Sequence, residues 1–348
     1  MRLFHNDYNA MCHPAILQKM QDMAPVAVTS YGLDPVCEKA AGYIRQACQN
    51  PALSVHFLSG GTQTNLTVIA AALRPHQAVI AAASGHISEH ETGAIEATGH
   101  KVLELPASDG KITASQVEKV VLDHYSPDGP GGEHMPQPKM VYISQPTELG
   151  TLYTLNELES LAETCQKYGL DLYADGARLG YGLTAPGNDI TLPDMARLCD
   201  VFYIGGTKVG AMFGEAVVIR NPSLSQDFRY FIKQRGGMLA KGWLLGLQFE
   251  ALFENGLYFT ISRLANGQAQ QIRDALKRLG YPLVVDSPTN QVFTVMSDGV
   301  LARLEREFSF TNWCRVDPEH RMIRFCTSWA TRQEDTDALC DFLEKITK

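Results

Sequence analysis

Short apolar, β-branched segments alternate with amphipathic segments from about residue 53 to residue 220. The apolar segments predict strands at residues 54–58, 77–83, 101–105, 139–144, 170–174, 200–204 and 215–219. Between them, apolar positions recur at the helical period and predict helices that include residues 63–73, 113–123 and 155–168. Strands that alternate with helices are typical of parallel βαβ units. The pattern therefore predicts an α/β fold with a mostly parallel, seven-stranded sheet covered on both faces.

The pattern changes in the last third of the chain. Residues 126–138 are rich in Pro and Gly and predict a surface loop, and residues 227–237 resemble a charged linker. Helices are expected at residues 243–255 and 257–279, followed by strands near 283–285, 291–296 and 322–326. A last helix should start at Thr331, because its spacing to Glu334 fits a capping box. We expect an N-terminal segment and large domain over residues 1–240, and a small α+β domain over residues 241–348.

The charge balance excludes several classes of partner. The 348-residue chain has 30 basic and 38 acidic residues, a formal net charge of −8, and no Lys/Arg-rich block. This composition argues against general binding to nucleic acid or to anionic membranes. The polar N-terminus is unlike a signal peptide, and the apolar runs are too short to cross a bilayer. The eight cysteines lack CxxC spacing, so we expect buried free thiols and a cytoplasmic protein.

A glycine turn follows the first predicted strand, with the sequence Ser-Gly-Gly-Thr-Gln-Thr-Asn at residues 59–65. Glycines let the backbone approach an anion closely, and the start of a helix offers free N–H groups and a favourable dipole. Gly60, Gly61 and Thr62 are therefore candidates for holding a phosphate. The turn matches neither a P-loop nor a dinucleotide fingerprint.

Residues 86–90 read His-Ile-Ser-Glu-His, which matches the inverted zinc-protease motif. On a helix His86 and His90 would share one face, so a zinc hydrolase that uses His86, Glu89 and His90 is one alternative. The segment also directly follows an apolar strand, which places His86 at the strand's carboxyl end. There its imidazole could lie against a cofactor ring or act in acid–base chemistry, which is the interpretation we favour. For His90 we favour an ordinary packing or solvent-facing role.

The block Asp175-Gly176-Ala177-Arg178 ends one predicted strand, and Gly205-Gly206-Thr207-Lys208 follows another. A lysine can hold an aldehyde cofactor covalently, while an aspartate keeps the cofactor's ring nitrogen protonated. This pair suggests pyridoxal phosphate. Arginine binds carboxylates with two parallel hydrogen bonds, and Arg178 and Arg324 are the candidates for an amino-acid carboxylate. Arg324 lies in an apolar strand, where a charge calls for a partner.

With these residues the chain resembles the threonine aldolase/β-eliminating lyase family of fold-type-I pyridoxal-phosphate enzymes, which have an aspartate aminotransferase-like large domain. The resemblance rests on the order and spacing of these blocks: Asn6-Asp7, residues 31–35, residues 61–65, His86 with Glu91 and Gly93, residues 175–178, Thr207-Lys208, Gly236-Gly237-Met238 and residues 323–325. It implies cleavage of L-threonine, L-allo-threonine or a related β-hydroxy amino acid to glycine and an aldehyde. The alternative is β-elimination from another amino acid.

The resemblance also implies roles for individual residues. Lys208 would hold the cofactor, Asp175 would pair with its ring nitrogen and His86 would stack on the ring. Further expected contacts to the cofactor are Gly60, Gly61, Thr62, Arg178 and Thr207, and to the substrate Asn6, Tyr31, Arg178 and Arg324. The family forms dimers or tetramers in which a neighbouring subunit completes each site, so Tyr31 and residues 235–241 are expected to act across an interface.

Three positions depart from the family's pattern. Asn6-Asp7-Tyr8 stands where its threonine aldolases often have Ser-Asp-Thr. Glu148 stands where well-known bacterial members have a histidine near the substrate hydroxyl, so His86 and Glu148 are both candidates for the base. Leu239 replaces an arginine after Gly-Gly-Met, which leaves Arg235 or Lys241 to supply charge near the phosphate.

Overall fold

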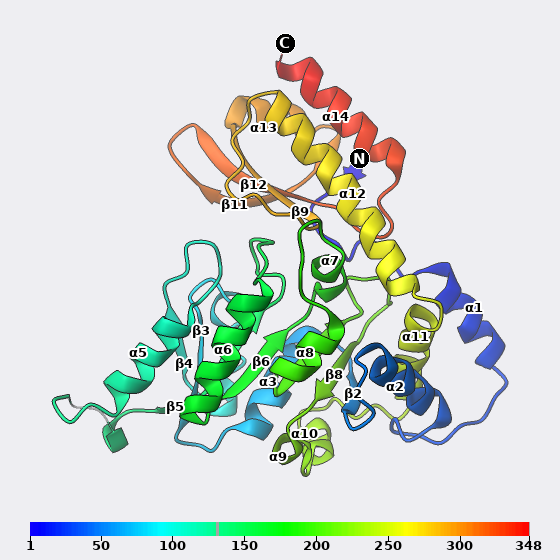
Figure 1. Ribbon diagram of the computed structural model, residues 1–348. Helices are drawn as coiled ribbons and strands as arrows, with labels where there is room; N and C mark the ends of the chain where they lie inside the picture. The colour runs from blue at the N-terminus through cyan, green and yellow to red at the C-terminus, as the bar shows by residue number, and fades with distance from the viewer. Residues whose placement is uncertain (130–131, 348) are drawn as a thin grey trace.

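A seven-stranded sheet is the centre of the computed structural model, which describes residues 1–129 and 132–347 (Figure 1). Its order is β2-β8-β7-β6-β5-β3-β4. The strands are β2 (Ser54–Leu58), β3 (Gln77–Ala82), β4 (Val102–Leu105), β5 (Gln137–Ser144), β6 (Asp171–Asp175), β7 (Val201–Gly205) and β8 (Glu215–Ile219). Only β8 runs antiparallel to its neighbours within this sheet. The predicted mostly parallel sheet is confirmed.

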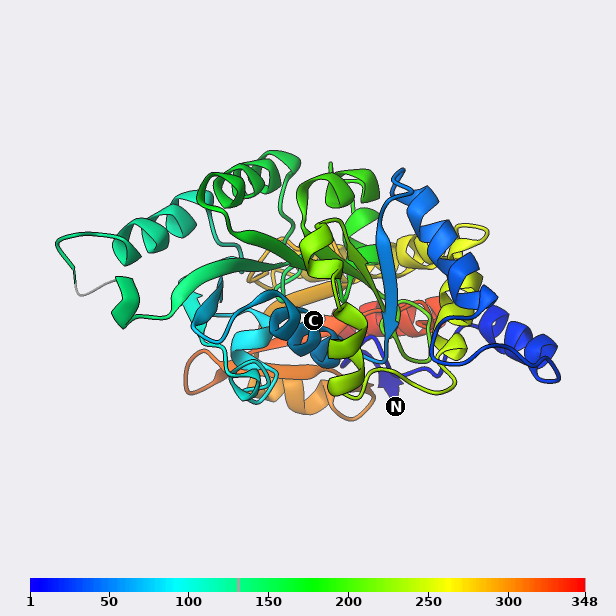
Figure 2. The same cartoon turned by 90° about the horizontal axis from the view of Figure 1, so that it is seen from below.

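Helices cover both faces of the sheet, because alternate strand residues point to opposite sides. Val141 and Ile143 join one buried cluster, whereas Met140 and Tyr142 join the other. The first cluster contains residues of α2 (Pro35–Ala47), α5 (Ala114–His124), α6 (Leu155–Tyr168), α8 (Leu192–Leu198) and α11 (Trp243–Phe253). The second contains residues of α3 (Gly61–Ala72) and α10 (Phe228–Gln234). Figure 2 shows helices on opposite sides of the strands.

A second, smaller sheet is antiparallel and has the strand order β11-β12-β9. Its strands are β9 (Gln291–Ser297), β11 (Thr311–Arg315) and β12 (His320–Cys326). Residues of α12 (Leu257–Arg278), α13 (Asp298–Leu304) and α14 (Gln333–Thr347) pack with it in a third apolar cluster. The N-terminal strand β1 (Arg2–Leu3) pairs with β10 (Phe308–Ser309), and Phe4 is buried in the same cluster.

The apolar clusters divide the chain differently from the predicted boundary at residues 240 and 241. The apolar residues of α11 from Leu247 to Phe253 and Ala265 of α12 pack with the large sheet, whereas Ala269 of α12 packs with the small one. The 22-residue helix α12 therefore spans both parts, as Figure 1 shows. The first residues of the chain belong to the small part through Phe4.

Three details of the predicted secondary structure need correction. Residues 227–237 are not a linker but contain α10, since Phe228 and Ile232 are four residues apart and pack on the sheet. The expected strand at 283–285 is only a bridge between Leu283 and Thr294. The last helix begins at Gln333, while the Thr331 hydroxyl accepts the Ser328 N–H at 2.8 Å.

Within the 126–138 loop, Gln137 and Pro138 already belong to β5, and residues 130 and 131 lie outside the described part. All eight cysteines are free thiols, as expected, and six of them are buried. Cys314 is exposed and Cys340 is half-buried. In the described part of the chain, no helix is both long and apolar enough to cross a membrane.

Candidate active site

Five predicted site elements meet at the carboxyl edge of the large sheet. The glycine turn follows β2, His86 begins the short helix α4 (His86–Glu89) after β3, and Glu148 follows β5. Asp175 is the last residue of β6, and Lys208 lies three residues beyond β7. These strands run in the same direction, so their ends share one edge, which is where α/β sheets usually bind ligands.

Asp175 is a buried carboxylate whose two oxygens accept four hydrogen bonds. Oδ2 accepts the Tyr142 hydroxyl at 2.6 Å and the Asn65 amide at 3.1 Å. Oδ1 accepts the Tyr203 hydroxyl at 2.5 Å and the Ala177 N–H at 2.9 Å. Burial acts to raise the pKa of Asp175, but the nearby His86 charge and the tyrosine hydrogen bonds outweigh burial and lower it. Asp175 is therefore ionised, and a cationic ring would meet a fixed negative charge.

Tyr142 and Tyr203 come from β5 and β7, the two strands that flank β6. Sequence reasoning missed both, because a tyrosine in an apolar strand also fits an ordinary core position. A buried phenol needs a hydrogen-bond partner, and here the partner is the carboxylate between the strands.

A second polar chain connects Asp175 with His86. The Tyr173 hydroxyl donates to Asn65 Oδ1 at 2.6 Å, which turns the Asn65 amide N–H groups toward Asp175 and Glu91. Glu91 Oε1 also pairs with His86 Nδ1 at 2.7 Å. Because a carboxylate only accepts, His86 Nδ1 donates the hydrogen in this contact.

Lys208 lies in a turn that two glycines bring against the end of β6. The Gly205 N–H donates to the Gly176 carbonyl at 2.9 Å, and a side chain on Gly176 or Gly205 would collide with the facing backbone. Burial and the charge of Arg178 lower the pKa of Lys208. A lowered pKa favours the neutral, nucleophilic amine.

Glu215 is a further buried acid at this turn and was not predicted. Its Oε2 accepts the Gly206 N–H at 3.0 Å, and burial raises its pKa. The Thr207 hydroxyl accepts the Gly214 N–H at 3.0 Å, so that side chain is engaged in holding the turn.

The glycine turn has the form expected of an anion site. Helix α3 starts at Gly61, and Gly60 precedes it in an extended conformation with no side-chain cap. A Cβ on Gly61 would press on the Tyr203 hydroxyl, whereas Gly60 faces open space and Thr62 is exposed. The Gln63 side chain is held by Ser59 and by the Arg235 carbonyl.

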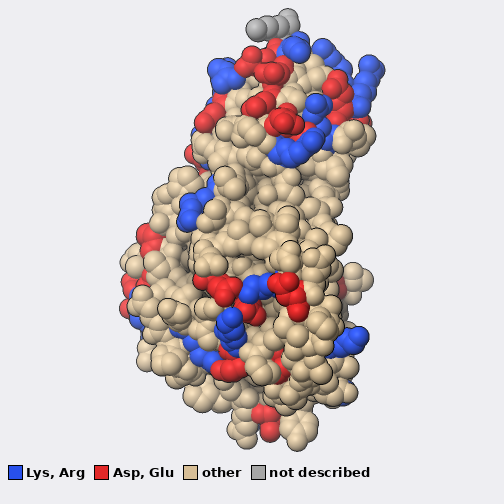
Figure 3. All heavy atoms as spheres, turned by 90° about the vertical axis from the view of Figure 1, so that its right-hand side faces the viewer, with Lys and Arg blue, Asp and Glu red and all other residues tan. Residues whose placement is uncertain are grey.

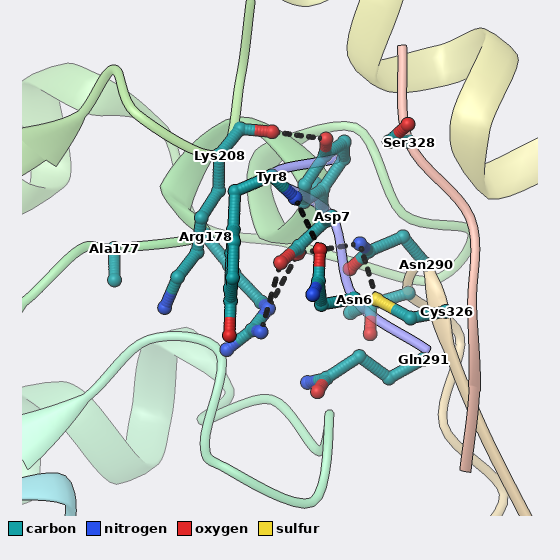
Figure 4. Close-up of polar contacts among 12 residues, drawn as sticks. Asn6, Asp7, Tyr8, Ala177, Arg178, Lys208, Asn290, Gln291, Cys326 and Ser328 are labelled. Carbon is teal, nitrogen blue, oxygen red and sulfur yellow. Dashed lines mark hydrogen bonds and ion pairs between the residues drawn. The ribbon is translucent and has the colours of Figure 1, made fainter. Parts of the chain in front are cut away.

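The fork of Arg178 is occupied by Asp7. Nε donates to Oδ2 at 2.7 Å and Nη2 to Oδ1 at 3.0 Å, and Oδ2 also accepts the Asn290 amide at 2.9 Å (Figure 4). Burial acts to raise the pKa of Asp7, but the positive charges of Arg178 and Lys208 outweigh it and lower the pKa to about 2. Asp7 was not predicted as a site residue. Its neighbour Asn6, which was, accepts the Tyr8 N–H at 3.0 Å instead.

Arg324 projects from β12 and is nine-tenths buried. Nη1 donates to Gln291 Oε1 at 2.8 Å, and Nη2 donates to the His5 carbonyl at 3.2 Å and to the Thr311 hydroxyl at 3.3 Å. Its guanidinium also lies 5.3 Å from the centre of the Trp313 ring. Burial lowers the pKa of Arg324, because the cation lacks a carboxylate within hydrogen-bonding distance among the described residues.

A family model described as beta-eliminating lyase matches residues 5–298. The chain belongs to this family. It is 43% identical to threonine aldolase from Leishmania major, with a TM-score of 0.97 and full coverage of both chains. It is 28% identical over 330 residues to low specificity L-threonine aldolase from Pseudomonas aeruginosa, covering 94% of this chain and 92% of that protein. A low specificity L-threonine aldolase from another Pseudomonas strain is 29% identical over 305 residues, covering 87% of this chain and 86% of that protein.

Membership of the beta-eliminating lyase family gives no support to the zinc-hydrolase alternative. His86 uses Nδ1 for Glu91, while the His90 ring packs against His86 and Trp313 at 5.6 and 6.1 Å between ring centres. Among residues 1–129 and 132–347, no three His, Cys, Asp or Glu side chains are grouped to hold a metal ion.

The remaining predicted residues lie elsewhere or have other contacts. The Tyr31 carbonyl accepts a hydrogen bond from Arg229, and Lys233 lies 5.2 Å from the centre of the Tyr31 ring, so Tyr31 lies beside α10. Glu148 Oε1 accepts the His86 N–H at 2.9 Å and the Ser144 hydroxyl at 2.7 Å. Burial raises the pKa of Glu148. Lys241 is exposed.

Proposed function

We propose that this protein is a pyridoxal-phosphate-dependent aldolase. It cleaves L-threonine, L-allo-threonine or a related β-hydroxy amino acid between Cα and Cβ, releasing glycine and an aldehyde. The observation that carries the proposal is the buried Asp175 carboxylate, which accepts four hydrogen bonds at the same sheet edge as the half-buried amine of Lys208. The likeness to proteins named threonine aldolase supports the substrate class.

The residues at the sheet edge fit this cofactor. Lys208 would hold it covalently, Asp175 would face its ring nitrogen and His86 would lie on the ring. Backbone N–H groups at Gly61 and Thr62 would receive the phosphate. All four acceptor positions of Asp175 are filled, so a ring N–H must share or replace one of them. Asn65 makes the longest, at 3.1 Å.

When bound, pyridoxal phosphate supplies an electron-accepting ring that takes up the electron pair of the broken Cα–Cβ bond. Asp175 keeps the required negative charge in place, and Arg324 binds the substrate carboxylate. Glu148 accepts the substrate hydroxyl proton at its Oε2 atom, since Ser144 and the His86 N–H orient the carboxylate through Oε1. A raised pKa suits a base that works near neutral pH. The substitution Glu148→Gln should lower kcat by roughly 10²- to 10⁴-fold, and an unchanged kcat would move the role to His86.

The function is tested with purified protein, pyridoxal phosphate and L-threonine. The protein should take up the cofactor with a yellow colour and release glycine and acetaldehyde, and Lys208→Ala should lose both properties. A protein that binds no cofactor contradicts the proposal. Release of ammonia and a keto acid from serine or cysteine, without glycine from threonine, would instead assign β-elimination.

We also propose a cytoplasmic homodimer or homotetramer. Several large apolar side chains are exposed between residues 8 and 33, including Tyr8, Met11, Val26, Tyr31 and Leu33. Much of the face on the side of α1 (Pro14–Met23) and α2 is uncharged (Figure 3). Light scattering at several protein concentrations would determine the subunit number, and a monomer at all of them would contradict the proposal.

A further inference from the structure

We propose that Gln291 is a substrate-binding residue which, together with Arg324, receives the carboxylate of the amino acid. The proposal rests on the proposed function and adds a residue that the sequence did not single out. Gln291 is the first residue of β9 and is fully buried. In the antiparallel register Arg324 faces Phe293, so Gln291, two residues away, is its diagonal neighbour on the same face of the small sheet.

The orientation of the Gln291 amide is fixed by its partner. Arg324 Nη1 donates to Gln291 Oε1 at 2.8 Å. A guanidinium has donors and no acceptor, so the amide oxygen must face it and the NH₂ group must point the other way. In Figure 4 the amide end of Gln291 extends away from β9, toward the side where Arg178 and Asn6 lie.

Two donors of this pair are left without partners. Gln291 Nε2 and Arg324 Nε are both buried and make no hydrogen bond within the described residues. A buried donor without an acceptor destabilises the structure, because it has lost its hydrogen bonds to water and gained none in return. A carboxylate is an acceptor-only group of opposite charge, so it would satisfy both donors and compensate the Arg324 charge. Because neither atom is open to solvent, binding must open the contacts that now cover them.

The adjacent residue connects this pair with the other arginine. Asn290 donates through Nδ2 to Asp7 Oδ2 at 2.9 Å, and Asp7 holds Arg178. The consecutive side-chain amides of Asn290 and Gln291 thus connect to both arginines: Asn290 to Arg178 through Asp7, and Gln291 directly to Arg324. We assign carboxylate recognition to Gln291 because its free group is a donor, whereas the unpaired atom of Asn290 is the acceptor Oδ1.

The experiment measures binding of glycine and of ethanolamine, which lacks the carboxylate, to the cofactor-loaded protein by calorimetry. Gln291→Leu should weaken glycine binding by roughly 10- to 100-fold, the loss expected for hydrogen bonds to a charged group. Ethanolamine binding should not change. Gln291→Glu should weaken glycine binding further, because the new carboxylate neutralises Arg324 and repels the ligand. The control Gln268→Leu removes a glutamine of α12 that bonds to the Thr331 carbonyl, and it should leave both affinities unchanged.

The outcomes are distinct. Unchanged glycine affinity in Gln291→Leu, or equal weakening of glycine and ethanolamine, overturns the assignment, and so does a wild-type protein that binds no glycine. A wild-type protein that binds glycine through Gln291 but cleaves no β-hydroxy amino acid overturns the proposed function alone. Retention of the cofactor colour in all three variants shows that they are folded.

Discussion

The two halves of the site hold buried charges in opposite ways. In the large domain Asp175 accepts four hydrogen bonds, and its pKa is lowered, which favours the charged carboxylate. In the small domain Arg324 has no carboxylate within hydrogen-bonding distance among the described residues, and its Nε is unpaired. Burial lowers the pKa of Arg324, which disfavours the charged guanidinium. Both Asp175 oxygens are therefore hydrogen-bonded without a ligand, whereas Arg324 keeps a donor that has no partner among the described residues.

The difference suits two tasks: Asp175 holds a charge that stays fixed, whereas Arg324 is proposed to bind and release a substrate carboxylate. A charge that stays fixed through the reaction is best held by rigid neighbours, because no reorganisation is then needed during catalysis. A guanidinium that binds and releases a substrate carboxylate in every cycle needs a free donor, because a fully paired one would first have to break a contact within the protein. Substitutions in the large domain should therefore change cofactor chemistry and kcat, whereas those at Arg324 and Gln291 should change substrate affinity.

The largest expected effect comes from Asp7, which contacts both halves through Arg178 and Asn290. Asp7→Asn leaves the Arg178 charge buried without a carboxylate, which should cost roughly 3–5 kcal/mol of unfolding free energy. The folded pKa of about 2 lies below the ordinary value of 3.8, so the pair stabilises the fold fully above about pH 4. The difference between wild type and variant should shrink as the pH falls toward 2.

Urea unfolding at several pH values measures this difference. The matched control is Asp298→Asn, since Asp298 pairs with Arg315 and Arg321 but is 41% exposed. Exposed pairs contribute roughly 0–1 kcal/mol each, so this variant should remain close to wild type. Equal losses in the two variants would contradict a special role for the buried pair.

A smaller effect is expected when Asp175 is made neutral. Asp175→Asn keeps the shape of the side chain but removes the charge that the ring of the proposed cofactor would face, and kcat should fall by about 10²- to 10³-fold. The yellow colour should persist, because Lys208 is unchanged. Asp171→Asn is the matched control: it lies on the same strand, at the opposite end, and should leave kcat near wild type. A normal kcat in Asp175→Asn would contradict the claim that the reaction needs a fixed negative charge at this position.

Much of the large domain could be predicted because its signals are local. Each strand is a short apolar run, and the observed bounds lie within two residues of the predicted ones. Parallel strands bring their carboxyl ends together, so Asp175 and Lys208 could be placed at one edge from the sequence alone. The N-terminal helices α1 and α2 were not predicted, although Asp34 caps α2 through the Cys37 N–H at 2.8 Å.

Arg178 and Arg324 were predicted as candidates for carboxylate binding, but their partners could not be predicted, because these contacts join distant segments. Asp7 and Arg178 are 171 residues apart, and Gln291 and Arg324 meet only through the register of β9 and β12. A buried glutamine or asparagine has no pattern in the sequence that separates a ligand donor from a core amide. The tyrosines around Asp175 were hidden for a related reason, since their partner depends on which strands are neighbours.

The smallest expected effect tests how the large domain keeps Asp175 charged. Tyr203→Phe removes one donor from Oδ1, and a hydrogen bond to a charged group contributes roughly 1.5–3 kcal/mol. Loss of that donor raises the pKa of Asp175, so the carboxylate becomes protonated at a higher pH. The acidic side of the kcat/KM profile for threonine should therefore move upward by about 1–2 pH units. In Tyr153→Phe, which removes a buried hydroxyl that accepts the Ile112 N–H, the profile should stay in place. If Tyr203→Phe lowers stability but leaves the profile unmoved, the phenol supports the core and not the charge.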